Sequence, residues 1–447
     1  MMNRVRVFHF ILAILLLIHS IDSFSQSKRK RRWADLIDTT SKVANGLRCE
    51  NFVYKPNIRT VQLYDQSFEL SQPILNLESD EKLVLCFDDL DGDSKNYMFT
   101  LIHCNAEWQV DDLSPSDYIE GFTDHVIIDH KFSLNTIQPF THYSAVFPNE
   151  NLHITKSGNY ILKVYQDNKP DNLVLTKRFM VFRNFVSVDA KVKPSTITEF
   201  RTFKQEIDFT INHQEYSITD PYQDLKVVIT QNNRWDNAKR NIKPLFVKDN
   251  ELVYDYDDVN VFDGGSEFRI FDIKSIRYHS ERVQNIYKDS LGNHVILQPD
   301  EKRSFKRYAS GIDMNGNYIV KTQDGTNSSI EADYCLVHFY IPYDNAYTSG
   351  NLYVAGAFND WRFDSENLMK NNPKRLGYEC TLYLKQGYYN YEYVFLPNGE
   401  TEYDQTYIEG MHQETDNDYT IYVYHHQTGT FYDQLIGVKR LNSIKDR

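Results

Sequence analysis

The sequence lacks the common signatures of an active site. It contains no G-x-S-x-G, no H-E-x-x-H, no P-loop and no glycine fingerprint for dinucleotides. Paired carboxylates such as Asp257-Asp258 stand only in charged, turn-like stretches, where a solvated surface is the ordinary explanation. We therefore expect a protein that is not an enzyme, with no catalytic residue and no cofactor.

The chain also lacks the positive charge that nucleic-acid binding requires. Its formal net charge is −13, whereas phosphate backbones select a basic face. One basic block is present, Lys28–Arg32. Because like charges repel one another in any compact element, we interpret it as a solvated tail. Nucleic acid is thus excluded as the expected partner.

Long apolar runs are scarce. The one clear case, Phe8–Ile18, follows Arg4 and Arg6 and precedes Ser23-Phe24-Ser25. This order is typical of a secretory signal peptide cleaved near Ser25. The run is too short for a membrane span, which needs about 20 residues, so the mature chain is predicted to be exported and to have no transmembrane segment.

Cysteine is present in an odd number, which leaves at least one thiol unpaired. The five residues are Cys49, Cys86, Cys104, Cys335 and Cys380. A hairpin containing Cys86 and Cys104 would hold them too far apart for a bond. Cys335 and Cys380 stand on predicted strands of one domain, so a disulfide or two buried thiols both remain open.

Helical apolar periodicity is rare, whereas aromatic residues are abundant. They make up 14% of the chain, with 32 Tyr and 27 Phe, and these residue types favour pleated, half-buried surfaces. Short strand-like runs alternate with turn signals such as Pro148-Asn149 and Asp263-Gly264-Gly265. This regular spacing of strand-like runs and turns predicts an all-β fold of tandem immunoglobulin-like β-sandwich domains.

The predicted organisation has six parts. They are a signal peptide at residues 1–25, a basic N-terminal segment at 26–57, a first β-sandwich domain at 58–183, a second β-domain at 184–326, a third β-sandwich at 331–434 and a C-terminal tail at 435–447.

The stretch Leu83–Trp108 is the most distinctive in the first domain. Two apolar runs, Leu83–Phe87 and Tyr97–Cys104, flank a turn-like segment and predict a hairpin with a long loop. The end of the second run and the residues after it include side chains that hydrophobic packing alone does not require. His103, Asn105, Glu107 and Trp108 either present an interface to a partner or lock the hairpin through hydrogen bonds.

The turn of this hairpin resembles a calcium loop only superficially. It carries Asp88, Asp89, Asp91 and Asp93. Counted from Asp89, Ser94 stands where the turn glycine of an EF-hand is needed, and Thr100 stands where the bidentate Glu is needed. We therefore expect a solvated turn and assign no metal site.

The third domain carries a ligand-type signal. Gly356–Trp361 and Leu384–Val394 resemble the glycogen-binding, early-set immunoglobulin-like modules attached to starch and glycogen enzymes. That resemblance implies two exposed aromatics that stack on sugar rings, of which Trp361 matches one. The second would follow Asn398-Gly399, where this chain has Glu400 and Thr401. Trp361 is therefore a weak candidate for carbohydrate stacking.

A further resemblance covers nearly all of the expected mature chain. An ordered set of motifs is similar to that of the plug protein family of the Bacteroidetes type IX secretion system. The motifs are Phe87–Leu90, His103–Trp108, Ser133–Thr136, Pro148-Asn149, Ser157–Tyr160, Gln231-Asn232, and Glu267–Arg269 with Asp272. Leu134 departs from the family pattern, in which Phe is expected.

The resemblance implies a periplasmic gating subunit associated peripherally with the outer membrane. It would dock on the periplasmic mouth of the large outer-membrane translocon β-barrel of the type IX system and occlude it. The alternative, from the third domain, is an exported protein that binds α-glucans.

Overall fold

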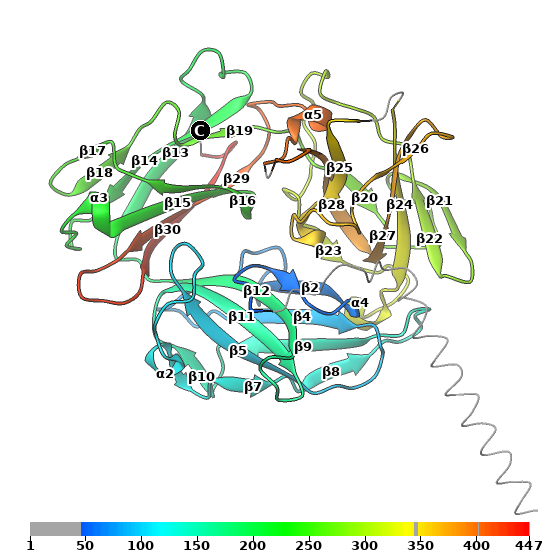
Figure 1. Cartoon of the computed structure of the whole chain (residues 1–447), viewed down its shortest axis with the longest axis horizontal. Helices are drawn as coiled ribbons and strands as arrows, with labels where there is room; N and C mark the ends of the chain where they lie inside the picture. Colours follow the sequence, from blue (N-terminus) through cyan, green and yellow to red (C-terminus); the bar gives the residue numbers. More distant parts are fainter. Residues whose placement is uncertain (1–45, 344–346, 401, 447) are drawn as a thin grey trace, which may run out of the picture.

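The computed structural model describes residues 46–343, 347–400 and 402–446. The predicted signal peptide and the basic block Lys28–Arg32 lie outside these residues. Strands dominate the described chain, and its α-helices are four residues long. None of the described helices has the length and hydrophobicity needed to cross a membrane. The all-β prediction is confirmed, and Figure 1 shows the strands in three lobes.

The first lobe is a sandwich of two sheets. One has the order β1-β12-β11-β5-β7, with β3 beside β12, and the other has the order β2-β4-β9-β8. Its elements are β1 (Phe52–Val53), β2 (Ile58–Asp65), β3 (Ile74–Asn76), β4 (Leu83–Asp89), β5 (Tyr97–Cys104), α2 (Pro115–Tyr118), β6 (Ile119–Gly121), β7 (Asp124–Val126), β8 (Asp129–Phe132), β9 (Thr141–Phe147), β10 (Leu152–Ile154), β11 (Gly158–Gln166) and β12 (Leu173–Phe182).

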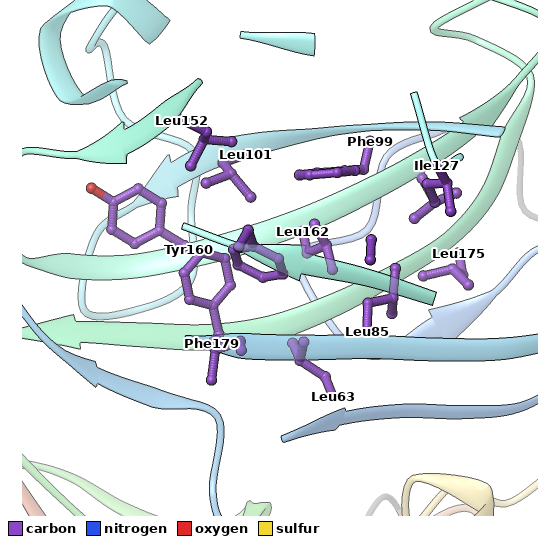
Figure 2. Close-up of a cluster of buried hydrophobic side chains, with 14 of the residues drawn as sticks. Leu63, Leu85, Phe99, Leu101, Ile127, Leu152, Tyr160, Leu162, Leu175 and Phe179 are labelled. Carbon is purple, nitrogen blue, oxygen red and sulfur yellow. The ribbon is translucent and has the colours of Figure 1, made fainter. Parts of the chain in front are cut away.

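The core of this lobe follows from alternation along the strands. In β5 every second residue is buried from Tyr97 to Leu101, so one face of the strand is apolar and turned inward. Figure 2 shows Phe99 and Leu101 packed with Leu85, Leu162 and other apolar side chains between the two sheets.

The predicted hairpin in the first lobe is wrong. β4 pairs with β2 and β9, whereas β5 pairs with β11 and β7, so the two strands belong to opposite sheets. The aspartate-rich segment between them crosses the sandwich. A local pattern of strand, turn and strand does not tell a hairpin from such a crossing, because only long-range pairing separates them.

The second lobe combines chain segments that are far apart in the sequence. Its sheets have the orders β13-β14-β18-β17, with β19 beside β14, and β16-β15-β29-β30. Its elements are β13 (Ser187–Pro194), β14 (Lys204–Asn212), α3 (Pro221–Asp224), β15 (Leu225–Gln231), β16 (Arg234–Ile242), β17 (Phe246–Val247), β18 (Glu251–Tyr254), β19 (Val261–Asp263), β29 (Asp418–His425) and β30 (Gln434–Asn442).

The third lobe packs two sheets around a tyrosine-rich core. One sheet has the order β20-β28-β23, with β25 beside β28, and the other has the order β21-β22-β24-β27-β26. Its elements are β20 (Arg269–Asp272), β21 (Val283–Lys288), β22 (Asn293–Leu297), β23 (Tyr318–Val320), α4 (Ser328–Glu331), β24 (Tyr334–Pro342), β25 (Gly350–Ala355), the 3-10 helix η1 (Ala357–Asn359), β26 (Lys370–Asn372), β27 (Gly377–Lys385), β28 (Gly387–Pro397) and α5 (Thr406–Glu409).

The predicted divisions at residues 326 and 434 do not follow this strand pairing. β20, expected in the second domain, pairs with β28, and β29, expected in the third, pairs with β15. The expected tail contains β30, which pairs with β29. Strand patterns show which segments are extended, whereas sheet membership depends on packing between distant segments. The immunoglobulin-like connectivity stays a prediction.

Candidate partner interface

The segment that follows β5 is a tight loop held by Asn105. Its side-chain Oδ1 accepts hydrogen bonds from the backbone N–H groups of Glu107 at 3.0 Å and Gln109 at 2.9 Å. Trp108, which donates its backbone N–H to the Asn105 carbonyl at 3.0 Å, has a left-handed φ of 62°. Such a backbone is unfavourable for a bulky residue, so Asn105 stabilises the conformation that turns Trp108 inward.

His103 is buried and links the loop to β11. Its Nδ1 contacts the carboxylate of Asp111, and its Nε2 lies 3.2 Å from the Ser157 carbonyl oxygen. A Cβ atom at Gly158 would lie 2.4 Å from the same Nε2, and Gly158 has a φ of +149°. Glycine is therefore required there. His103 and the Ser157–Tyr160 motif thus fit together inside the protein.

Trp108 joins the first lobe to the second. It is 4% exposed, and its ring meets Trp235 of β16 edge-on with centroids 5.0 Å apart. The guanidinium carbon of Arg178 lies 4.4 Å from the centroid of the Trp108 ring. Tyr422 and Tyr424 of β29 complete this buried cluster. We call the contact of Trp108 with these residues the apolar joint.

Glu107 is the exposed member of the four predicted residues. It accepts a hydrogen bond from Lys226 Nζ at 3.0 Å, and Lys226 also binds Asp433 at 3.0 Å. Asp433 accepts the backbone N–H of Ala106 at 2.9 Å. Burial raises the pKa of Asp433, but these bonds hold it below its usual value. In this structure the four residues thus belong to a hydrogen-bonded loop and an internal joint, and the side chains of His103 and Trp108 are buried.

A second joint connects the first lobe to the third through charges. Asp88 of β4 and Lys385 of β27 are each 1% exposed and lie 2.6 Å apart. Tyr334 donates its hydroxyl to Asp88 at 2.8 Å, and His142 Nδ1 lies 2.7 Å from the other Asp88 oxygen. Burial raises the pKa of Asp88, but Lys385 and His142 lower it below its usual value. We call these four residues the polar joint.

The prediction of a solvated aspartate turn is wrong for Asp88 and Asp89. Asp89 is fully buried and accepts hydrogen bonds from Asn57 at 2.6 Å and the Tyr97 hydroxyl at 3.0 Å. It approaches Asp91 and Asp93 as a metal ligand set would. However, Lys95 Nζ lies 2.6, 2.5 and 3.4 Å from the three carboxylates. A side-chain ammonium thus binds all three carboxylates and offsets part of their negative charge.

Trp361 is partly covered by side chains of the second and third lobes. The guanidinium carbon of Arg234 lies 3.9 Å from the centroid of the Trp361 ring, and the centroids of the Phe268 and Trp361 rings are 5.7 Å apart. Trp361 also lines a cavity of about 470 Å³ together with Tyr64 of the first lobe and Trp235 of the second. Trp361 therefore lies where the three lobes meet.

The first lobe exposes an apolar surface that the sequence interpretation missed. Phe122, Val126, Ile128 and Phe132 are 66, 50, 77 and 56% exposed. We call these four residues the apolar edge. They lie on or beside β7 and β8, each the last strand of its sheet. Figure 1 shows both strands at the bottom of the first lobe, on the side opposite the other two lobes.

The signal for the apolar edge in the sequence is ambiguous. Val126–Ile128 is a short apolar run of the kind that is typical of a strand. In the structure only its middle residue, Ile127, is buried, at 3% exposure. Leu134, the departure from the expected family pattern, is 53% exposed nearby, and its N–H donates to the Ile330 carbonyl at 2.9 Å.

Comparison with known proteins places these features in a family. Residues 58–183 match the model of the type 9 secretion system plug protein 1st domain. No curated protein matches the chain. The crystal structure of a hypothetical protein from Parabacteroides merdae is similar, with a TM-score of 0.85 and 32% sequence identity, over 89% of this chain and 100% of that one. The chain therefore belongs to the same family as the Parabacteroides merdae protein, and its residues 58–183 form a type 9 secretion system plug protein 1st domain.

Proposed function

We propose that the protein is a non-enzymatic periplasmic gating subunit that docks on the periplasmic mouth of the type IX outer-membrane translocon barrel and occludes it. The match of residues 58–183 to a plug domain supports this role. The predicted signal peptide supports export, and the tandem sandwiches offer broad surfaces for contact with another protein.

The apolar edge is the observation that carries the proposal. Monomeric proteins rarely expose large apolar patches without an interaction to make. Unpaired edge strands also offer backbone groups to another protein. Here both features coincide within the matched plug domain, on the face opposite the other lobes. We therefore propose that this surface binds the rim of the translocon barrel.

The two joints hold the three lobes together, which makes the protein suitable as a plug. Occluding a pore requires that the lobes stay fixed while one face is bound. The apolar joint and the polar joint connect the first lobe to both of its neighbours through buried side chains. A specific interface buries at least about 1,200 Å² in total, so the surroundings of the apolar edge must contribute as well.

The test is an affinity-tagged full chain incubated with detergent-solubilised outer membranes of its source bacterium, followed by mass spectrometry of what is retained. The wild type is expected to retain a large outer-membrane barrel. Ile128→Asp combined with Phe132→Asp should lower its recovery about tenfold or more, because apolar anchors dominate binding energy.

Phe305→Asp is the matched control, because Phe305 is 76% exposed in the third lobe and Ile128 is 77% exposed. Full recovery by the edge variants would refute the apolar edge as the docking site while leaving the gating role intact. Failure of the wild type to retain any barrel would refute the gating role. Binding of an α-glucan that is lost in Trp361→Ala would then favour the carbohydrate alternative.

A further inference from the structure

Two cysteines meet beside the apolar joint. Cys49 precedes β1 and is partly exposed, whereas Cys104 ends β5 and is fully buried. Cys104 belongs to the cluster that contains Trp108, Cys49 packs against the same cluster, and the two thiols interact with one another. The Cys49 carbonyl accepts a hydrogen bond from Arg178 Nε at 2.8 Å, which fixes this segment against β12.

The surroundings give the two thiols different reactivity. The hydrogen bond with Cys104 lowers the pKa of Cys49 to about 7, although burial opposes this, and the charge of Arg178 adds to the lowering. The same hydrogen bond and burial raise the pKa of Cys104. A thiolate is the attacking species in disulfide exchange. Cys49, the more accessible of the two, is thus the nucleophile.

No other pairing suits the five cysteines, all of which lie within the described residues. Cys86 belongs to the opposite sheet, where it contacts the Tyr64 hydroxyl. Cys335 is opposite Leu384 in the β24–β27 ladder, and Cys380 is opposite Phe339. The four-residue offset separates Cys335 and Cys380 by about 13 Å along the strands. This excludes the Cys335–Cys380 disulfide that the sequence left open.

We propose that Cys49 and Cys104 form a disulfide when the protein meets a disulfide donor. The Cys49 thiolate attacks one sulfur of the donor, a new S–S bond forms, and the donor's other sulfur leaves and takes up a proton. Cys104 then loses its proton and attacks the Cys49 sulfur, which releases the second donor sulfur as a thiol. Two protein thiols are oxidised, and the donor disulfide is reduced to two thiols.

The bond would close a loop from Cys49 to Cys104 and fasten the segment before β1 to the end of β5. Such a bond restricts the unfolded chain and persists in oxidising compartments. It would also hold in place the strand end from which the Asn105 loop and Trp108 extend, so oxidation would reinforce the apolar joint.

The experiment uses the purified full chain incubated with oxidised glutathione, then alkylated under denaturing conditions and digested with trypsin without reductant. The expected product joins the tryptic peptides 49–59 and 96–131 and weighs two hydrogen atoms less than their sum. Cys86, Cys335 and Cys380 should be alkylated. Dithiothreitol should then lower the Tm of the oxidised wild type.

Matched variants separate the bond from general thiol effects. Cys380→Ala should still give the cross-linked peptides and the Tm shift, whereas Cys49→Ala should give neither. Because Cys104 is fully buried and Cys104→Ala could unfold the chain, Cys49→Ala is the deciding variant. Complete alkylation of Cys49 and Cys104 after oxidation, or a glutathione adduct on Cys49 that Cys104 does not displace, would overturn the proposal.

Discussion

The first lobe is joined to its two neighbours by contacts of different chemistry. The apolar joint packs Trp108 against Trp235 with Arg178 over one ring. The polar joint instead buries the Asp88–Lys385 pair. Aromatic burial stabilises by removing apolar surface from water, whereas a buried ion pair must first offset the loss of hydration of both charges. The two joints should therefore respond differently to substitution.

The largest effect is expected from breaking the polar joint on one side. Asp88→Ala leaves the Lys385 ammonium buried, with the Ser329 carbonyl at 2.7 Å as a remaining acceptor. Removing one partner of a buried ion pair costs about 3–5 kcal/mol, and the free energy of unfolding measured in urea should fall by that amount.

The paired substitution sharpens this comparison. Asp88→Leu with Lys385→Met removes both charges and keeps apolar volume, so its loss of stability should be clearly smaller than that of Asp88→Ala. An equal or larger loss of stability in the double variant would show that the ion pair adds stability of its own, beyond each charge compensating for the burial of the other.

Breaking the apolar joint should cost about as much or slightly less. Trp108→Ala removes a buried indole, and large-to-small changes of this kind cost about 3–5 kcal/mol. In a double-mutant cycle with Trp235→Ala, the coupling energy should be about 0.5–1.5 kcal/mol. Glu107→Gln is the control, because its contact with Lys226 is at the surface and is worth less than about 1 kcal/mol. Additive Trp108 and Trp235 effects would contradict a direct contact between the lobes.

The joints also show how far the sequence could predict this protein. The all-β class and the strand at Tyr97–Cys104 followed from local pattern. The sequence could not decide between a partner contact and a locked loop at His103–Trp108. Gly158 packs against His103 and Trp235 packs against Trp108, and both are distant in the sequence. Asp88 and Asp89 looked like solvated turn residues, and only their partners from other strands show that they are buried. The apolar edge was missed because exposure is also decided by long-range packing.

The smallest expected effect concerns the pH dependence of the polar joint. Burial lowers the pKa of His142, but its bonds to Asp88 and Cys86 raise it to about 9 from the usual 6.5. Since the folded-state pKa is the higher one, the His142–Asp88 pair contributes fully below pH 6.5. That contribution is lost as the pH rises through 9. A shift of this size corresponds to at most about 3 kcal/mol.

Urea unfolding at a series of pH values checks this expectation. The free energy of unfolding of the wild type should decrease between pH 6.5 and 9. In His142→Gln the amide can still donate to Asp88 but does not titrate in this range, so the decrease should be much smaller. Lys385, whose pKa burial lowers, also faces Asp88, but a lowered pKa makes stability rise with pH, so Lys385 opposes the decrease. The difference between wild type and His142→Gln isolates the histidine, and identical pH profiles would refute His142 as the source of the decrease.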